Sequence, residues 1–287
     1  ASLPSDDSGI VGHHPGSFEF PFPELPVTQP QTPLILTDVQ DRVMTIRMNR
    51  ADKKNALTQG MYTALEQAVT DAANNPQVRV VLFVGSGGSF CAGNDLQDFL
   101  KLDHNTPREQ NPVLRFMTAL AALPKPVVAA VQGPAIGIGA TLLFHCDLVY
   151  AGDNAAFSMP FVNLGLCPEA ASSLLAPRMF GYHRAAEALL MGEPFFAEAA
   201  QEVGLVNRVV PPTEVNGAAQ GAARKLAVKP LSSLIETKRL MKGGQAQEVL
   251  AQMDLEAASF GRMLTEPAAK EAFTAFLGKR KPDFSAL

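Results

Sequence analysis

Residues 126–147 read PVVAAVQGPAIGIGATLLFHCD, and this stretch decides the local architecture expected for the chain. Val127–Val131 is a short apolar run typical of a buried strand, and QGPAIGIG then supplies three glycines and a proline. Helix-forming apolar residues follow from Ala140 to Phe144. The pattern predicts a strand, a glycine-rich turn and a helix whose free N–H groups face a cavity.

The spacing of the glycines limits what that turn can bind. Gly133, Gly137 and Gly139 give G-x-x-x-G-x-G, whereas a dinucleotide-binding turn needs G-x-G-x-x-G. A phosphate-binding P-loop needs Gly-Lys-Ser/Thr, and Ala140-Thr141 stands there instead. From this stretch alone, an anion, a developing oxyanion and a close-packed turn without a ligand all remain open.

Composition excludes several classes of protein. The 287 residues are 47% hydrophobic and 18% charged, which suits one large or two ordinary globular domains. A net charge of -4 argues against nucleic acid as the main partner. No apolar run reaches the roughly 20 residues that span a bilayer, and the first residues lack the pattern of a secretory signal. We therefore expect a cytoplasmic protein with no membrane association.

The cysteines and histidines give no sign of a metal centre or a hydrolase. Cys91, Cys146 and Cys167 are odd in number and widely spaced, which is typical of reduced thiols. The five histidines form no H-E-x-x-H motif, and His145 is expected to be a packed histidine. No metal is predicted.

The chain divides into three predicted regions. Residues 1–33 are rich in proline, with few periodic apolar positions, and predict an extended arm. A hairpin begins the folded core at Leu34, and strand and helix patterns alternate over residues 34–210. Residues 211–287 predict a C-terminal helical region. One long helix there carries an apolar stripe of Leu250, Met253, Ala257, Phe260 and Leu264.

The chain has two glycine-rich loops, and the first along the chain, at residues 85–96, changes the interpretation of the second, at residues 132–139. GSGGSFCAGNDL, residues 85–96, leaves the buried strand predicted at Val78–Val84 before Asp95 and Leu96 begin a helix. Two such loops can offer two backbone N–H groups to one oxygen. The pair therefore favours an oxyanion-binding site over a turn without a ligand.

Glu169 is an isolated acid in an apolar segment, where a helix is predicted to begin. An acid in the first turn of a helix commonly complements the helix dipole. The alternative is a carboxylate in an apolar pocket, where burial raises the pKa and makes the group a stronger base toward a carbon acid. The residues alone leave both interpretations open.

Five motifs, RADKKNAL, FCAGNDL, GPAIGIGATL, CDLVYA and PFVNLGLCPE, occur in that order between residues 50 and 169. In these motifs the chain resembles the crotonase, or enoyl-CoA hydratase/isomerase, superfamily from about Leu34 to the C-terminus. The resemblance implies an α/β fold, a crotonase-like spiral of strand-strand-helix repeats with a C-terminal helical trimerisation region. It also implies an acyl-CoA thioester as substrate, no bound cofactor apart from the coenzyme A of the substrate, and a homotrimer or a dimer of trimers.

Carried over by position, the resemblance places the oxyanion hole at the N–H groups of Asn94 and Ile138. The two glutamates of the family's hydratases fall at Thr141 and Phe161 in this chain. Glu169, by contrast, stands where 3,2-enoyl-CoA isomerases of the peroxisomal type carry a single catalytic glutamate. The resemblance therefore implies migration of the double bond from 3-enoyl-CoA to 2-trans-enoyl-CoA. The alternatives are another family reaction, as a hydratase or an aryl or cyclic acyl-CoA isomerase, or a trimer that binds acyl-CoA without catalysis.

Further residues are expected to contact the coenzyme A portion of the substrate. Exposed lysines can pair with its phosphates, although the basic turn at residues 50–57 also fits a solvated surface. The predicted contacts are Lys53, Lys54, Ala56, Ala92, Gly93, Asp95, Leu96, Lys279 and Lys281. Peroxisomal relatives often end in a Ser-Lys-Leu signal, whereas this chain ends Ser285-Ala286-Leu287, so the sequence does not favour peroxisomal import.

Overall fold

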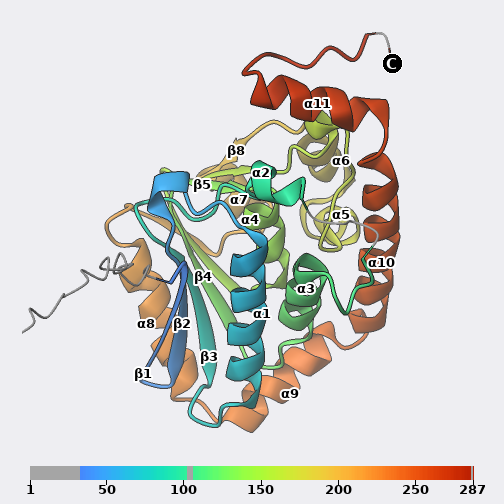
Figure 1. Ribbon diagram of the computed structural model, residues 1–287. Coiled ribbons are helices and arrows are strands. Elements are labelled where there is room, and N and C mark those ends of the chain that lie inside the picture. The colour runs from blue at the N-terminus through green and yellow to red at the C-terminus, as the bar shows by residue number, and fades with distance from the viewer. Residues whose placement is uncertain (1–32, 102–105, 286) are drawn as a thin grey trace, which may run out of the picture. The chain divides into compact units, whose positions relative to one another are not determined.

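The computed structural model describes residues 33–101, 106–285 and 287 (Figure 1). Residues 33–287 form one compact unit. The predicted arm, residues 1–33, lies outside the described residues except for Pro33. None of the described helices is both long enough and apolar enough to cross a membrane.

In the part of the chain that the structure describes, the strands form two sheets. The larger sheet has the order β1-β2-β3-β4-β6-β9, in which β1 and β2 are antiparallel and the other pairs are parallel. The smaller sheet has the order β5-β7-β8. The strands are β1 Ile35–Gln40, β2 Val43–Met48, β3 Val80–Gly85, β4 Val127–Val131, β5 Pro134–Ile136, β6 Leu148–Gly152, β7 Ala156–Ser158, β8 Phe195–Phe196 and β9 Arg208–Val210.

Helices surround both sheets, and the last four follow β9 in sequence (Figure 1). The α-helices are α1 Gln59–Asn74, α2 Leu96–Phe99, α3 Pro112–Ala122, α4 Ile138–Thr141, α5 Ser172–Phe180, α6 Tyr182–Ala186, α7 Ala197–Glu202, α8 Val215–Ala227, α9 Leu231–Lys242, α10 Ala246–Met263 and α11 Pro267–Leu277. The 3-10 turns are η1 Ala51–Lys53, η2 Leu142–His145 and η3 Val162–Leu164, and η4 Glu187–Met191 is a π-helical turn. The predicted α/β fold with a helical C-terminal region is confirmed.

The central strands are buried on both faces, which explains their continuous apolar sequence. In β3, Val80 and Leu82 pack in the layer beneath α8, whereas Val81 and Phe83 pack in the layer with α1 and α3. Figure 1 shows α8 and the α1–α3 pair on opposite sides of the sheet. A parallel sheet covered on both faces selects apolar residues at every position rather than at alternate ones.

The hairpin predicted at Leu34 is formed by β1 and β2, and β1 runs from Ile35 to Gln40. Asp41 and Arg42 both adopt positive φ, 52° and 64°, and form a two-residue turn into β2. Such a turn suits the twist of a hairpin, so both strands extend to its edge.

The sheet brings the two glycine-rich loops together. Parallel strands β3 and β4 end at the same edge, and the loops that leave them continue side by side. The Phe90 N–H donates to the Gln132 carbonyl at 2.7 Å, and the Ile136 N–H donates to the Cys91 carbonyl at 2.9 Å. Gly139 permits this approach, since a Cβ there would lie 2.5 Å from the Cys91 carbonyl oxygen. The pairing of the two loops inferred from the sequence is therefore present in the fold.

Candidate active site

Asn94, Ile138 and Glu169 line one cavity of about 360 Å³. The cavity lies between the two glycine-rich loops, the segment after β7 and the C-terminal helices α10 and α11. The three residues predicted to be catalytic are thus brought together from separate parts of the chain. Most of the remaining wall is apolar and includes Leu96, Phe99, Phe161, Leu164, Leu166, Phe260, Phe273 and Phe276.

Two backbone N–H groups on this wall are available to a ligand. Ile138 is the first residue of α4, so its N–H has no partner within the helix. Beside Asn94, the Leu57 N–H donates to the Gly93 carbonyl and the Asp95 N–H donates to the Leu57 carbonyl, both at 2.8 Å. This pairing turns the Asn94 N–H away from Leu57. Within residues 33–101 and 106–285, neither N–H has a hydrogen-bond acceptor, which suits an oxyanion hole.

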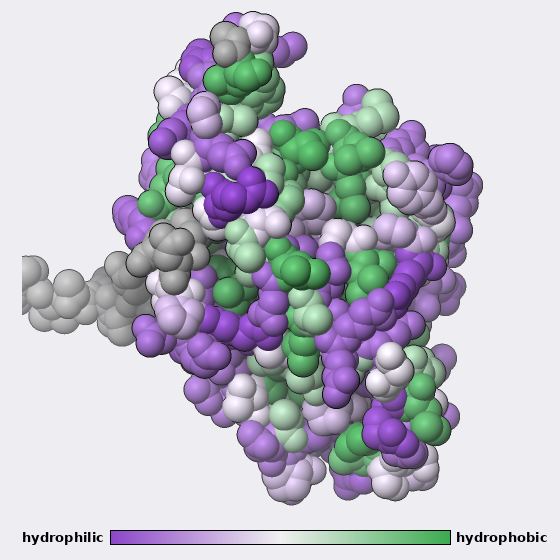
Figure 2. Space-filling view, turned by 90° about the vertical axis from the view of Figure 1, so that its right-hand side faces the viewer, coloured by the Kyte–Doolittle hydropathy of each residue, from purple (hydrophilic) through white to green (hydrophobic). Residues whose placement is uncertain are grey.

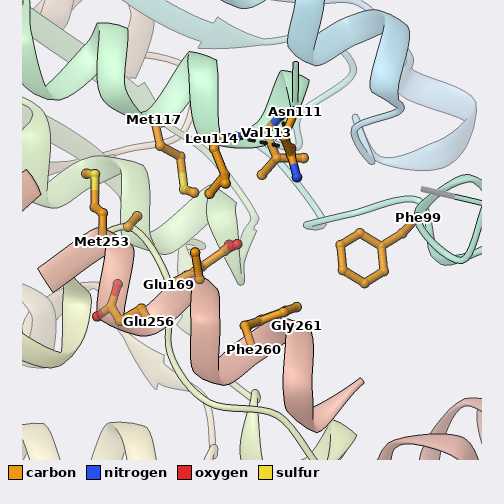
Figure 3. A pocket seen from close by; sticks show the side chains of 12 residues that line it. Phe99, Asn111, Val113, Leu114, Met117, Glu169, Met253, Glu256, Phe260 and Gly261 are labelled. Carbon is orange, nitrogen blue, oxygen red and sulfur yellow. Dashed lines mark hydrogen bonds between the residues drawn. The ribbon is translucent and has the colours of Figure 1, made fainter. Parts of the chain in front are cut away.

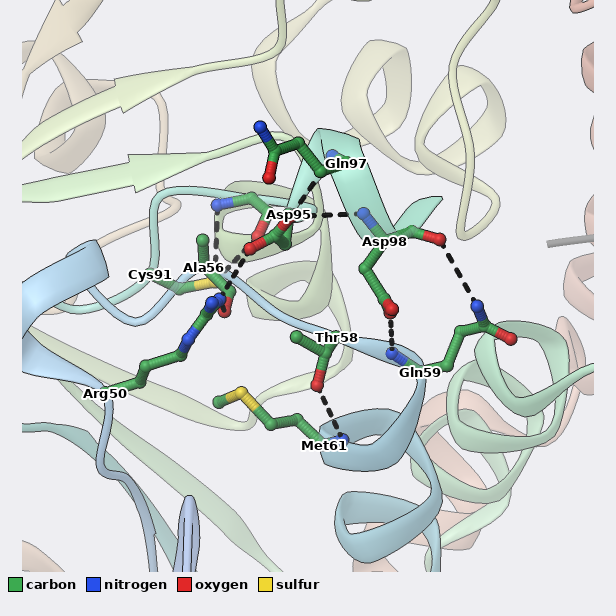
Figure 4. A network of polar contacts seen from close by, with 10 residues as sticks. Arg50, Ala56, Thr58, Gln59, Met61, Cys91, Asp95, Gln97 and Asp98 are labelled. Atoms are coloured by element: carbon green, nitrogen blue, oxygen red, sulfur yellow. Dashed lines mark hydrogen bonds and ion pairs between the residues drawn. The ribbon is translucent and has the colours of Figure 1, made fainter. Parts of the chain in front are cut away.

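A polar network holds the Asn94 loop in place (Figure 4). Arg50 forms an ion pair with Asp95 at 2.8 Å and also donates to the Ala56 carbonyl. Asp95 caps α2, and Asp98 accepts a hydrogen bond from the Gln59 N–H at 2.6 Å. Burial opposes ionisation of Asp95, but the bonds from Arg50 and the Asp98 N–H hold its pKa below the usual value. Arg50 opens the RADKKNAL motif, and sequence reasoning gave it no role.

The side chain of Asn94 is fixed separately from its backbone. The Tyr62 hydroxyl, from α1, donates to Asn94 Oδ1 at 2.5 Å. Tyr62 is fully buried, and burial raises the pKa of its hydroxyl, so this group stays protonated and keeps its donor. This hydrogen bond fixes the orientation of the Asn94 carboxamide beside the N–H of the same residue.

Glu169 carries a buried carboxylate. Its side chain is 7% exposed, and its Oε1 has no hydrogen-bond partner among the described residues. Burial first, and the charge of Glu256 second, raise the pKa of Glu169 to about 8. The residue lies before α5 rather than in its first turn, and Glu256 instead accepts from the N–H groups at the start of that helix. The structure therefore favours the apolar-pocket interpretation of Glu169 over a helix-dipole role.

Asn111 was missed by the sequence reasoning. Its Oδ1 accepts hydrogen bonds from the Val113 and Leu114 N–H groups and caps α3, while its Nδ2 donates to none of the described residues. It lines a second hollow, of about 50 Å³, which lies between α3 and α10 and also reaches Glu169. Figure 3 shows the side chains around this hollow. The Asn-Pro pair at the start of a helix signals a cap, but it carries no sign of the cavity.

Ala92, Gly93 and Leu96, three of the predicted coenzyme A contacts, line the main cavity. Asp95 lies among them in sequence but turns its carboxylate toward Arg50. Ala56 is half-buried, and its carbonyl accepts from the same guanidinium group.

The four predicted lysines occupy exposed positions. Lys53 and Lys54 lie in a turn that contacts the first glycine-rich loop, where the Ala92 N–H donates to the Lys54 carbonyl at 3.0 Å. Lys279 and Lys281 follow α11, the helix that supplies two phenylalanines to the cavity wall. Within the described residues, no group of three or more His, Cys, Asp or Glu side chains is placed to hold a metal ion.

Comparison with known families decides the class of the protein. The family described as Enoyl-CoA hydratase/isomerase matches residues 38–286. The chain belongs to the enoyl-CoA hydratase/isomerase family. Its chemistry is accordingly a transformation of an acyl-CoA thioester, and its fold is the crotonase fold.

Curated members of the family with different reactions are similar to the chain. The 1,2-epoxyphenylacetyl-CoA isomerase of Escherichia coli is 36% identical over 261 residues, 88% of this chain and 98% of that protein. The enoyl-CoA delta isomerase 2 of Rattus norvegicus is 36% identical over 76% of this chain and 56% of that protein. The 2,3-dehydroadipyl-CoA hydratase of Escherichia coli is 33% identical over 87% of this chain and 98% of that protein. Family membership therefore does not choose between hydration and isomerisation.

Solved structures of the family are similar to this fold over nearly their whole length. Pseudomonas aeruginosa OdaA is 45% identical with a TM-score of 0.82, covering 86% of this chain and 99% of that one. An enoyl-CoA hydratase/isomerase from Pseudoalteromonas atlantica is 38% identical with a TM-score of 0.83, covering 88% of this chain and 100% of that one.

Proposed function

We propose that the protein is a 3,2-enoyl-CoA isomerase that moves the double bond of 3-enoyl-CoA thioesters to the 2-trans position. The observation that carries this proposal is the carboxylate of Glu169, whose Oε1 has no hydrogen-bond partner among the described residues, in the same cavity as two N–H groups that also have none there. Migration of a double bond between neighbouring positions needs one base that can reach two carbons and one site that stabilises an enolate. The cavity supplies both.

The steps follow from these groups. Ionised Glu169 removes a proton from the alpha carbon of the 3-enoyl thioester, and the electron pair moves into the thioester carbonyl. The N–H groups of Asn94 and Ile138 donate to the resulting oxyanion of the dienolate. Protonated Glu169 then returns the proton to the gamma carbon. In a serine protease, one oxyanion-hole donor contributes about 2.7–4 kcal/mol, so two such donors can stabilise the dienolate substantially.

A hydratase mechanism has less support from the same site. Addition of water needs one group to deprotonate the water and another to protonate the alpha carbon, and Thr141 and Phe161 occupy the two glutamate positions of the family's hydratases. Phe161 and Leu166 instead add apolar surface to the cavity. Glu256, the other carboxylate at the neighbouring hollow, is occupied by donors from the backbone and from Ser173.

A second candidate is isomerisation of an aryl or cyclic acyl-CoA. Five phenylalanines line the main cavity, and aromatic side chains pack well against a planar ring. The similarity to a 1,2-epoxyphenylacetyl-CoA isomerase supports the same possibility. This reaction would use Glu169 and the two N–H groups in the same roles.

Homotrimer formation also belongs to the proposal. Leu240 and Met241 of α9, Leu255 of α10 and Phe276 of α11 are each more than half exposed. Figure 2 shows apolar side chains gathered in patches among polar ones on the face that carries α10. A second or third copy of the chain would cover such surface. A cytoplasmic location and the absence of a bound cofactor other than the substrate's coenzyme A stay predictions.

The test is a substrate panel assayed with the purified wild-type protein, Glu169→Gln and Glu248→Gln. Glu248 is a matched control because it is an exposed carboxylate in an ion pair with Arg178. We expect conversion of 3-enoyl-CoA, hydration of 2-enoyl-CoA at least about a hundredfold slower, loss of isomerisation in Glu169→Gln and retention in Glu248→Gln.

The other outcomes identify the alternatives. Comparable hydration and isomerisation would refute the isomerase assignment, and turnover of aryl or cyclic thioesters alone would favour the second candidate. Thioester binding without any turnover would indicate a binding protein. Undiminished isomerisation by Glu169→Gln would exclude Glu169 as the base.

A further inference from the structure

The turn that follows Glu169 has an unusual backbone. Ala170 and Ala171 have φ values of 60° and 58°, so two consecutive alanines adopt the left-handed conformation. A Cβ makes this conformation unfavourable, and residues hold it only when surrounding contacts impose it. Both alanines are buried, with 1% and 0% exposure. The contacts that hold this turn therefore also hold the carboxylate that precedes it.

Part of the turn is held from the segment after the second glycine-rich loop. His145 Nε2 lies 2.8 Å from the Ala170 carbonyl oxygen. Because a carbonyl only accepts, this nitrogen carries the hydrogen and donates it. Burial lowers the pKa of His145 to about 4, so the ring stays neutral above that pH. The Ser172 hydroxyl donates to the Glu169 carbonyl at 2.6 Å and fixes the other side of the turn.

The remaining contacts come from Glu256 on α10, 85 residues further along the chain than Ala171. Glu256 Oε2 accepts from the Ala171 N–H at 2.6 Å, and its Oε1 accepts from the Ser173 N–H at 3.0 Å and from the Ser173 hydroxyl. The side chain is 5% exposed. In Figure 3 its carboxylate points away from that of Glu169, although both residues border the hollow between α3 and α10.

We propose that Glu256 is a positioning residue for this reaction: it clamps the left-handed Ala170–Ala171 turn to α10 and thereby aims Glu169 into the cavity. The proposal rests on Glu169 as the base. Three donors satisfy Glu256, whereas Glu169 Oε1 has no donor in the part of the chain that the structure describes. Burial raises the pKa of Glu256, the bonds from Ser173 and the Ala171 N–H oppose that rise, and the charge of ionised Glu256 opposes ionisation of Glu169.

Glu256 is the group expected to act on Glu169 electrostatically near neutral pH. The other titratable groups coupled to Glu169 are Tyr62 from α1, Cys91 from the first glycine-rich loop and Cys167 from its own loop. Burial raises the pKa of Tyr62, that of Cys91 to about 12 and that of Cys167 to about 11. All three are therefore neutral over the pH range of an ordinary assay.

Three variants separate the clamp from the charge. Glu256→Gln keeps the size of the side chain but removes its charge. Only one end of the new amide can accept a hydrogen bond, so it cannot accept from both the Ala171 and the Ser173 N–H groups. Glu256→Asp keeps the charge but is one methylene too short to reach both the Ala171 and Ser173 N–H groups. Glu248→Gln removes another carboxylate that joins α10 to α5, through Arg178, without contacting the turn. Isomerisation of 3-enoyl-CoA by each variant is followed as kcat/KM from pH 5 to pH 10, with folding checked by circular dichroism.

We expect kcat/KM to fall about tenfold in Glu256→Gln and Glu256→Asp and to stay unchanged in Glu248→Gln. Activity requires ionised Glu169, so kcat/KM rises with pH through the pKa of that group. Loss of the Glu256 charge lowers this pKa, so the rising limb of Glu256→Gln should move to lower pH. The limb of Glu256→Asp should stay in place. Adding Ala171→Gly to Glu256→Asp should recover activity, because glycine adopts positive φ without strain.

The proposal would be overturned if Glu256→Gln had the kcat/KM of the wild type and the rising limb of its pH profile had not moved. If the rising limb of the kcat/KM profile moved as far in Glu256→Asp as in Glu256→Gln, entry of water rather than loss of charge would explain the shift. That result would overturn the electrostatic action of Glu256 on Glu169. If Glu256→Gln does not fold, the rate of Glu256→Asp and its recovery by Ala171→Gly decide whether the clamp exists. Glu169→Gln is measured alongside as a test of the base itself. If Glu169→Gln stays active, Glu169 is not the base, and this result is distinct from a failure of the clamp.

Discussion

Replacing Glu169 by glutamine should make the folded protein more stable, by an amount that grows with pH. Burial raises the pKa of Glu169 from 4.5 to about 8, so the folded state holds this proton in a pH range where the unfolded chain has released it. Between pH 4.5 and pH 8, folding must take up a proton at this site, and stability falls as pH rises. Above pH 8 Glu169 is ionised in both the folded and the unfolded state, and the full free-energy cost of burying the charged carboxylate is present.

The size of the effect follows from the shift. At about 1.36 kcal/mol per pKa unit, a rise from 4.5 to about 8 corresponds to about 5 kcal/mol. Glutamine has a similar shape and no titration, so Glu169→Gln should differ little from the wild type near pH 4.5. The stability difference should increase steadily to about 5 kcal/mol at pH 9. Such a cost at a functional carboxylate is an expected conflict between stability and activity.

The assay is urea unfolding of both proteins at several pH values, at one fixed protein concentration because assembly contributes to stability. The informative quantity is the slope of the stability difference against pH, since an unsatisfied amide adds an offset that does not vary with pH. Glu248→Gln serves as the exposed control. A stability difference for Glu169→Gln that is flat from pH 5 to pH 9 would refute the buried, proton-holding state of Glu169.

Three further outcomes are expected. Gly139→Ala should lower kcat by up to about a hundredfold with the protein still folded, because the new Cβ would lie 2.5 Å from the Cys91 carbonyl oxygen and displace the Ile138 N–H. Wild-type kinetics of this variant would contradict the prediction. Light scattering at working concentration should give the mass of a trimer or of a dimer of trimers, and a stable monomer would exclude that assembly. Reversing the charge of the exposed lysines should weaken the apparent affinity for acyl-CoA at low salt, seen as a higher KM with little change in kcat, whereas an unchanged KM would make them solvated surface. Those lysines are Lys53, Lys54, Lys279 and Lys281.

Local sequence determined the elements whose causes lie within a few residues. The apolar run of β4 gave a strand with the predicted bounds, Val127–Val131, because a chain segment buried on both faces needs an apolar side chain at every position. Thr58 and Asp95 cap α1 and α2, and such caps depend on local sequence because a cap acts on N–H groups two or three residues away. The glycines marked both loops, since only glycine tolerates the close approach found at Gly139.

Tertiary structure decided which of those local features act together. The two glycine-rich loops meet through the bridge between Cys91 and Ala135, 44 positions apart in sequence, and parallel strands β3 and β4 impose that register. Glu169 could be recognised as an isolated acid, but its raised pKa depends on burial and on Glu256, which arrives on α10. Long-range contacts of this kind leave no periodic or motif signal in the sequence around either partner. They exist only once the sheet has fixed where each segment ends.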